Sequence, residues 1–247
     1  MRQFAVEMDK VLRRKETYIF LLVFFFIPLF FSYQISTNSG VVSLHSQTSS
    51  ISIFELIELY LGFITSLFLP FIAVAGFTTS TVSREIEEGS IKLYISHSKS
   101  RLSLYLAKCL SIASIMFILY LLFCISSYLG LLMFEHKKIS FNYNVEAMES
   151  FFKMFACSYV ATIVLALIGF CFSLFIGVTG TYAGMLGLVI ISKILELSNV
   201  SKEYLLTFLS DATKVTDINK AISILFLYFL IFGVLGATIF KRMDVQK

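Results

Sequence analysis

Long stretches without a charged residue alternate with short charged segments along this chain, and this pattern predicts membrane-spanning helices. A helix needs about 20 apolar residues to cross the roughly 30 Å hydrocarbon core of a bilayer. One charge-free stretch, 154–192, is too long for a single helix, and Gly177 and Gly180 within it favour a turn. We therefore expect an all-α polytopic membrane protein, with a single transmembrane domain over residues 1–247. Its six spans are predicted at about 17–36, 59–82, 109–134, 154–176, 180–197 and 221–240.

Two prolines, Pro28 and Pro70, fall inside the first and second predicted spans. A proline inside a helix removes one backbone hydrogen bond, and it commonly bends the helix at that point. We expect a bend in each of these two spans, either as a static kink or as a hinge.

The overall composition agrees with a membrane protein, because 57% of the residues are apolar and only 15% are charged. Soluble domains carry roughly 25% charged residues, so this chain has too few charges to cover a surface in contact with water. The net charge of +4 is modest. We expect the partner surface to be the lipid bilayer of the cell membrane, and we expect no binding of nucleic acid.

The positions of Lys and Arg predict the orientation in the membrane, since cytoplasmic loops carry the excess of these residues. They gather before the first span, between the second and third spans, and after the last. With six spans and both termini inside, 13 of the 20 basic residues lie in the cytoplasm. Both termini of this multi-pass chain are therefore predicted to be cytoplasmic.

The first 16 residues predict an amphipathic helix at the membrane interface. Phe4, Met8, Val11 and Leu12 share one helical face, and basic residues occupy the others. A short solvated lead-in to the first span is the alternative interpretation.

The sequence lacks the patterns that would indicate an enzyme or a metal site. It contains no phosphate-binding loop, no His-Glu-x-x-His and no Gly-x-Ser-x-Gly, and its four cysteines form no Cys-x-x-Cys pair. The predicted spans hold almost no ionisable residue, which disfavours an ion-coupled carrier or channel. They also offer hydroxyl groups without a base, which disfavours an intramembrane enzyme. We expect no catalytic residue, no metal and no cofactor bound by this chain itself.

The segment 81–101, between the second and third spans, combines many charges with an apolar run at 91–95. Gly89 can end a short helix, Ser90 can cap the next one, and Ser100 can cap the helix that enters the third span. These features predict a rigid helical elbow that projects into the cytosol and offers apolar and charged groups to a partner. A solvated loop that obeys the positive-inside rule has a similar composition, so composition alone leaves both interpretations open.

This segment resembles the signature loop of ABC transporter permeases of the type-2 exporter class. In that family, two Glu residues and a Gly-Thr/Ser step precede an apolar run that ends in Ser-x-Pro-x-Ser-Arg, and a Gly-Lys step follows. The chain departs from the pattern at Ser98, where proline is usual, and at Ala107, where glycine is usual. The matching residues are Glu85, Glu88, Gly89, Ser90, Leu93, Ser96, Ser100, Arg101 and Lys108.

The resemblance implies that the segment is a coupling helix seated against a separate ABC-type ATPase subunit, which binds the ATP. It also implies that the permease pairs with a second copy or a paralogue, and that a substrate moves outward. Uncharged, Phe-rich spans suit an amphipathic or apolar cargo such as a peptide, a lipid-linked molecule or a drug. An ion-coupled carrier or channel, an intramembrane enzyme and a scaffold role are the alternatives. The residues expected at the ATPase contact are Arg84, Glu85, Glu88, Gly89, Ser90, Leu93, Ser96, Ser100, Arg101 and Lys108.

Overall fold

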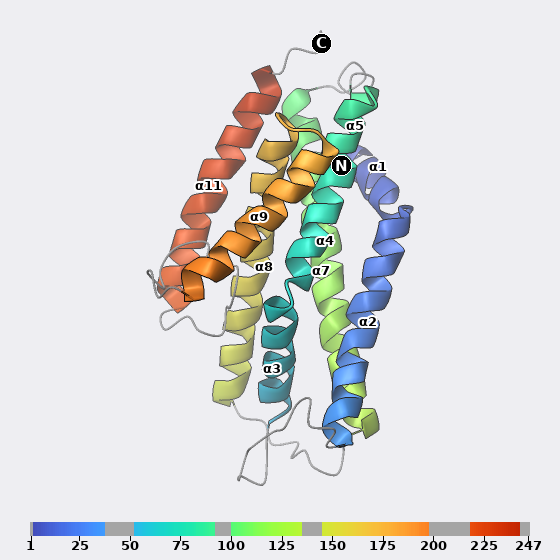
Figure 1. Ribbon diagram of the computed structural model, residues 1–247, viewed down its shortest axis with the longest axis vertical. Helices are drawn as coiled ribbons and strands as arrows, with labels where there is room; N and C mark the ends of the chain where they lie inside the picture. The colour runs from blue at the N-terminus through green and yellow to red at the C-terminus, as the bar shows by residue number, and fades with distance from the viewer. Residues whose placement is uncertain (1, 38–51, 92–99, 135–144, 198–217, 243–247) are drawn as a thin grey trace.

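The computed structural model describes residues 2–37, 52–91, 100–134, 145–197 and 218–242, and within these ranges the regular structure is helical throughout (Figure 1). The all-α prediction is therefore confirmed for the described residues. The elements are α1 (Arg2–Leu12), α2 (Lys15–Ser36), α3 (Ile53–Ser66), α4 (Leu69–Thr78), the π-helix η1 (Thr79–Ser83), α5 (Arg84–Glu87), α7 (Arg101–Phe134), α8 (Val145–Ser173), α9 (Val178–Leu197) and α11 (Ile218–Arg242).

Four of the described helices are long and apolar enough to cross a membrane, namely α2, α7, α8 and α11. The bent pair of α3 with α4 and its continuation to Glu87 makes a fifth if it counts as one span. The predicted span at 180–197 corresponds to α9, whose apolar part within the described residues, Val178–Ser192, is shorter than a span. The chain has the helices of a membrane protein, and the count of six spans stays a prediction.

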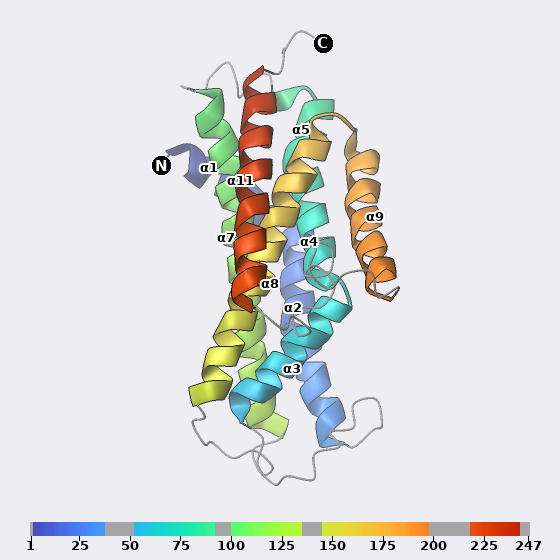
Figure 2. The same ribbon diagram turned by 90° about the vertical axis from the view of Figure 1, so that its left-hand side faces the viewer.

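The helices form an elongated bundle with two unequal halves, as the two perpendicular views show (Figures 1 and 2). Helices α7 and α8 run along most of the bundle, while α3 and most of α2 lie in one half. Helices α9 and α11 lie beside the other half and end near the level at which α3 gives way to α4. Helices α1 and α5 and the C-terminal end of α11 lie toward the end of the bundle at which α4 leads into α5.

The second predicted span is broken near its middle, where the two helical halves meet at 56°. Phe68, between α3 and α4, takes a left-handed backbone conformation with φ 58°, and Pro70 is the second residue of α4. Proline is well tolerated in the first turn of a helix, where its missing N–H has no intrahelical partner. The expected bend at Pro70 is confirmed as a break, whereas Pro28 lies buried within an unbroken α2.

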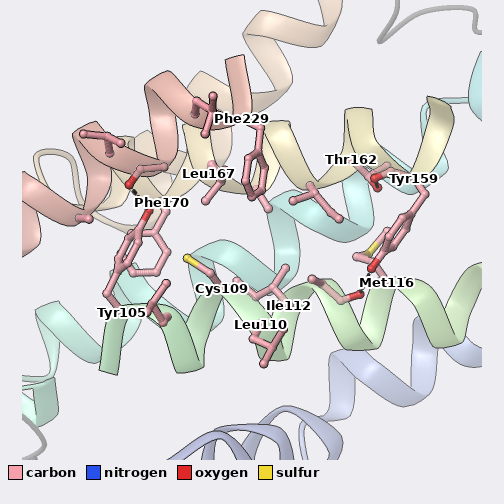
Figure 3. Close-up of a pocket in the computed structure, with 18 residues that line it drawn as sticks. Tyr105, Cys109, Leu110, Ile112, Met116, Tyr159, Thr162, Leu167, Phe170 and Phe229 are labelled. Atoms are coloured by element: carbon pink, nitrogen blue, oxygen red, sulfur yellow. Dashed lines mark hydrogen bonds between the residues drawn. The ribbon is translucent and has the colours of Figure 1, made fainter. Parts of the chain in front are cut away.

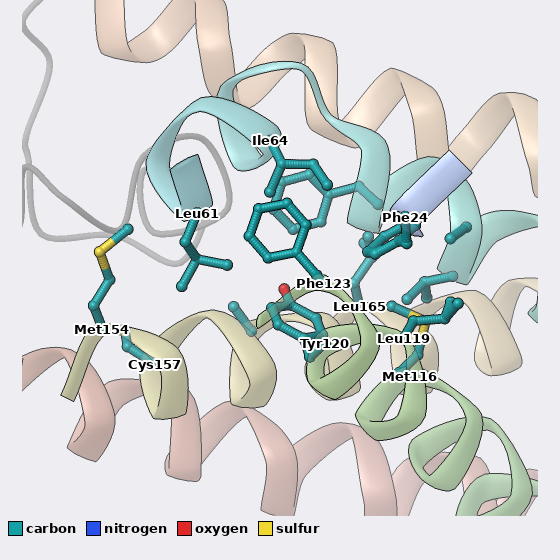
Figure 4. Packing of buried hydrophobic residues seen from close by; sticks show 14 of the residues in the cluster. Phe24, Leu61, Ile64, Met116, Leu119, Tyr120, Phe123, Met154, Cys157 and Leu165 are labelled. Carbon is teal, nitrogen blue, oxygen red and sulfur yellow. The ribbon is translucent and has the colours of Figure 1, made fainter. Parts of the chain in front are cut away.

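One apolar core joins α2, α3, α4, α7 and α8, and Figure 4 shows its central side chains. Phe24, Leu61, Tyr120, Phe123 and Leu165 are each at most 1% exposed there. In a membrane, an apolar side chain is surrounded by apolar atoms whether it contacts the protein or the lipid. Bundles in lipid are therefore also stabilised by close approach of the helices and by interhelical hydrogen bonds.

Those polar contacts occur where helices cross closely. The hydroxyl of Ser32 on α2 donates to the Tyr60 hydroxyl on α3 at 3.2 Å. A Cβ on Gly130 of α7 would lie 2.9 Å from Ser32 Cβ, so glycine permits α2 and α7 to approach closely at this point.

The outer surface of the bundle carries many large apolar side chains. Ile19, Phe26 and Val234 are 58%, 57% and 60% exposed, on α2 and α11. Contiguous apolar surface of this kind is rare on soluble monomers and is the normal outer surface of a bundle in lipid.

Candidate functional site: a buried charge cluster at one end of the bundle

The chain segment that leaves the second predicted span runs through a π-helical turn before it reaches the charged residues. The hydroxyls of Thr79 and Thr81 in η1 donate to the carbonyl oxygens of Ala75 and Phe77, at 2.8 and 2.6 Å. Such bonds from Ser and Thr hydroxyls to the preceding turn are common in helices, and π-helical turns are frequent at functional sites. Here the turn leads directly into α5 and brings Glu85 into the interior.

Lys108 is the centre of a buried cluster of charged side chains. It lies two turns inside α7 with a fully buried side chain, and its ammonium Nζ donates to Glu85 Oε2 at 2.6 Å and to Glu7 Oε2 at 2.8 Å. A third bond, of 3.1 Å, goes to the main-chain carbonyl of Thr81 in η1. An ammonium has three N–H donors, so these bonds satisfy Lys108 completely.

Two further basic side chains flank the same carboxylates. Lys10 donates to Glu7 Oε1 at 2.6 Å and lies 3.6 Å from Glu85 Oε1. Arg14 lies 3.7 Å from the same Glu85 oxygen. The cluster thus holds three cations against two carboxylates, and we call these five residues (Glu7, Lys10, Arg14, Glu85 and Lys108) the inner charge cluster.

Glu7 shows how the inner charge cluster balances burial against attraction. Its carboxylate is 3% exposed, and loss of hydration by itself would raise its pKa. The nearby positive charges of Lys108 and Lys10, with the hydrogen bonds they donate, outweigh that effect, and the pKa of Glu7 is lowered. Glu7 is therefore ionised at neutral pH.

The inner charge cluster attaches α1 to the rest of the bundle. Val11 of α1 is fully buried beside it, and the Thr17 hydroxyl at the start of α2 donates to the Val11 carbonyl at 2.5 Å. The predicted N-terminal helix is confirmed, but its buried face includes Glu7 as well as Val11, while Leu12 is 39% exposed. Its position at a membrane interface stays a prediction.

The same segment is also attached to α9. Glu87 Oε1 accepts a hydrogen bond of 2.6 Å from the main-chain N–H of Val178, the first residue of α9. A carboxylate at this position satisfies an unpaired helix N–H and interacts favourably with the helix dipole. The Ser83 hydroxyl donates to the Thr181 hydroxyl at 3.1 Å in the interior. Residues 83–87 therefore contact α1, α7 and α9 at one place.

The turn between α8 and α9 confirms part of the sequence expectation, because it ends at Gly177, whereas Gly180, expected within the turn, is the third residue of α9. α8 ends at Ser173 and α9 begins at Val178, so Gly177 immediately precedes α9. A Cβ on Gly177 would meet the Glu87 carboxylate oxygen, so a larger residue at this position would displace that carboxylate from the N–H of Val178.

The local turn signals that the sequence predicted in the segment are present. Gly89 has φ +71° and follows the C-cap residue Glu88, which ends α5 as expected. Ser100 caps α7, since its hydroxyl oxygen accepts from the N–H of Ser103 at 3.1 Å. Ser90 differs from the expectation in its bond, because its hydroxyl donates back to the Glu85 carbonyl at 3.3 Å.

The predicted partner-contact residues divide into buried and exposed groups. Glu85 and Lys108 are used inside the chain, whereas Arg84 and Glu88 form an exposed ion pair of 2.8 Å on the surface of α5. Arg101, at the start of α7, donates from Nη1 to the Lys241 carbonyl of α11 at 3.0 Å. Leu93 and Ser96, together with most of the apolar run at 91–95, lie outside the described residues.

The burial of Ile91 contradicts part of the expectation that the apolar run at 91–95 is open to a partner. Its side chain is 3% exposed and packs in a second apolar cluster with Val82, Leu104, Phe170 and Phe240. The beginning of the run is therefore bound within the chain, because the segment folds back onto α7, α8 and α11.

The sequence reasoning missed Glu7, Lys10 and Arg14 as members of the cluster. Glu7 lies three residues after Phe4 and four before Val11, on the apolar face of α1, where a lone carboxylate indicates a buried partner. Lys108 likewise shares a helical face with Leu104 and Ile112, both of which are buried. Among the described residues, no group of His, Cys, Asp and Glu side chains has the geometry to hold a metal ion.

One family model matches the chain, over residues 19–246, and its description is "Protein of unknown function (DUF2705)". The match includes Glu85 and Lys108 and begins after α1. No curated protein matches the chain.

Proposed function

The chain belongs to the DUF2705 family, and we propose that it is the membrane-spanning permease subunit of an ABC exporter of the type-2 class. In this proposal a separate ATPase subunit binds and hydrolyses ATP, and the permease moves an amphipathic or apolar substrate outward across the cell membrane. A second permease, either another copy or a paralogue, completes the transmembrane part.

The observation that carries the proposal is the buried ion pair between Glu85 and Lys108. These two residues match the first Glu and the final Lys of the type-2 exporter motif that the sequence resembles, and they lie 23 positions apart in the sequence. Their 2.6 Å contact fixes Glu85, in α5, to a position two turns inside α7. A displacement of α5 would therefore act directly on α7, which is what a coupling element between an ATPase and the spans requires.

The remaining contacts of the segment indicate where a displacement would go. Lys108 and Glu7 connect the segment to α7 and α1, and Glu87 and Ser83 connect it to α9. When the ATPase dimer closes on ATP, the proposed movement of the segment reaches these three helices together. The buried members of the motif then position the segment, and the exposed pair Arg84 and Glu88 is the part of α5 that meets the ATPase.

Co-purification with a charge-swap variant tests this proposal. The protein is extracted from its native membranes in mild detergent, and the companion is identified by mass spectrometry as an ATPase with Walker motifs. The test variant carries Arg84→Glu with Glu88→Arg, which keeps an ion pair at positions i and i+4 but inverts the charges seen by a partner. Like charges placed against each other at an interface are strongly unfavourable, so we expect the co-purified ATPase to fall about tenfold or more.

A matched control exists on α1, where Asp9 and Arg13 form an exposed pair of the same i, i+4 type, at 2.9 Å. The double substitution Asp9→Arg with Arg13→Asp should leave the amount of ATPase unchanged. The proposal is wrong if the wild-type protein brings down no ATPase, or if the swap at positions 84 and 88 has no larger effect than the control.

A further inference from the structure

A groove of about 550 Å³ lies between α7, α8 and α11 (Figure 3). This volume is within the range of about 300–1,000 Å³ that is usual for ligand sites. Helix α11 lies on the side of the bundle away from α2 (Figure 1). The groove runs along α7 from Tyr105 to Met116, and α11 forms its outer wall from Phe229 to Ala237. From chemistry and position, we propose that it binds an acyl chain of an anionic membrane lipid.

The interior of the groove is suited to hydrocarbon. Three lining side chains carry hydroxyls, and each donates to a main-chain carbonyl of the protein. Tyr105 donates to Gly233 at 3.2 Å, Tyr159 to Ala113 at 3.0 Å, and Thr162 to Tyr159 at 2.7 Å. The space is therefore lined by apolar atoms, and no lining hydroxyl is directed at a polar ligand.

Glycine provides part of the space. A Cβ on Gly233 of α11 would find only Leu167 Cδ1 within 4 Å, at 3.9 Å, so this wall has room where a larger residue would project. At the end near α1 and α5, the rings of Tyr105, Phe170 and Phe240 pack against one another. The side walls include Leu110 and Val234, which are 54% and 60% exposed, so the groove is open toward the surrounding lipid.

Two basic residues lie just beyond this end of the groove. Arg101 precedes Tyr105 by four residues on α7, and Lys241 follows Ala237 by four residues on α11. Side chains four apart share one helical face, so both basic residues continue the faces that line the groove. The Arg101 bond to the Lys241 carbonyl holds the two helix ends together.

This arrangement of an apolar groove with two cations at one end matches an anionic lipid. Its acyl chain fills the groove and its headgroup lies beside Arg101 and Lys241. The sequence predicts this end of the bundle to be cytoplasmic, which is the side where anionic lipids give membranes a negative surface. The inference is independent of the proposed transport function.

The absence of tryptophan from the sequence permits a direct test. A Phe229→Trp substitution places a single fluorophore in the groove, and Phe26→Trp places one on α2, where Phe26 is 57% exposed. Each variant is reconstituted in phosphatidylcholine vesicles with a small fraction of brominated phosphatidylglycerol or brominated phosphatidylcholine. Bromine quenches tryptophan on contact, so the ratio of quenching by the two lipids measures selectivity at each position.

Each of the two basic side chains should contribute a preference of about fivefold for the anionic lipid at the groove reporter, and the two contributions should multiply. The α2 reporter should be quenched equally by both lipids. Arg101→Gln with Lys241→Gln should remove the preference of the groove reporter while leaving quenching by phosphatidylcholine in place.

A second pair of variants tests the groove without changing charge. Gly233→Leu fills the space and should reduce quenching of the groove reporter by both lipids. Gly187→Leu, at a position on α9 with nothing within 4 Å of its Cβ, should have no effect. The proposal is overturned if the groove reporter shows no anionic preference, if neither lipid quenches it, or if Gly233→Leu leaves its quenching unchanged.

Discussion

Replacing Lys108 by methionine removes the central cation of the inner charge cluster while keeping nearly the same side-chain length. The substitution leaves the carboxylates of Glu7 and Glu85 buried, with Lys10 at 2.6 Å from the first and 3.6 Å from the second as their nearest remaining cation. Removing one partner of a buried ion pair costs about 3–5 kcal/mol. Because Lys10 and Arg14 retain part of the attraction, we expect a cost at the lower end, about 3 kcal/mol.

This cost should appear chiefly as detachment of α1, because Lys108 of α7 pairs with Glu7 of that helix. A Val11→Cys reporter, in a background whose four native cysteines are alanine, measures it, because Val11 is fully buried. A water-soluble maleimide can reach the thiol only when α1 leaves the bundle. A loss of 3 kcal/mol corresponds to labelling about 100-fold faster, given one factor of ten per 1.4 kcal/mol.

Two further variants separate the ion pair from other effects of the substitution. Adding Glu7→Gln and Glu85→Gln to Lys108→Met removes the two buried carboxylates and should restore most of the slow labelling, since the side chains of the remaining cations, Lys10 and Arg14, are 22% and 19% exposed and can be hydrated. Lys153→Met breaks an exposed ion pair with Glu149 and should leave labelling unchanged. The reasoning is refuted if Lys108→Met labels at the wild-type rate, or if the triple variant labels as fast as the single one.

Three other measurements follow from the structure. The pKa of Glu7 is lowered, so the stabilisation from its ionised form is complete above about pH 4.5 and is lost as the pH falls below that. The melting temperatures at pH 7 and pH 3.5 should therefore differ more in the wild type than in Glu7→Gln. Gly89→Ala should destabilise the segment by about 1–2 kcal/mol, because φ +71° is unfavourable with a Cβ even in open space, and equal melting of the two proteins would contradict this. Gly130→Ala should cost about 1–3 kcal/mol by forcing α7 from Ser32, whereas Gly187→Ala, inside α9 with open space around its Cβ, should not destabilise the protein, and unfolding in denaturing detergent compares the two.

Local patterns in the sequence were sufficient for the helices and for several of their ends. A charge-free run must hydrogen-bond its own backbone in lipid, so such runs predicted α2, α7, α8, α9 and α11. The turn before α9, the end of α5 at Gly89 and the cap of α7 at Ser100 also followed from single residues. These features depend on the conformations of a few consecutive residues, and therefore a sequence can specify them directly.

Helix lengths were predicted less well, because helices extend beyond the apolar stretch into polar residues. α7 begins at Arg101, directly after the predicted cap Ser100 and well before the span predicted from 109, and α8 begins at Val145 rather than 154. The second span, expected as one helix over 59–82, is a pair that meets at 56°. Pro70 indicated a bend, but its size depends on Phe68 and on packing against α8 and α9.

The inner charge cluster was decided only by the tertiary structure. Motif resemblance singled out Glu85 and Lys108, yet nothing local related either residue to Glu7, which is 101 positions from Lys108. Whether a charged residue near a helix end meets solvent, lipid or a counter-charge depends on how each helix rotates and how far it slides along its neighbours. The sequence thus determined which residues carry charge and which segments form helices, while long-range packing determined which of those charges neutralise each other away from water.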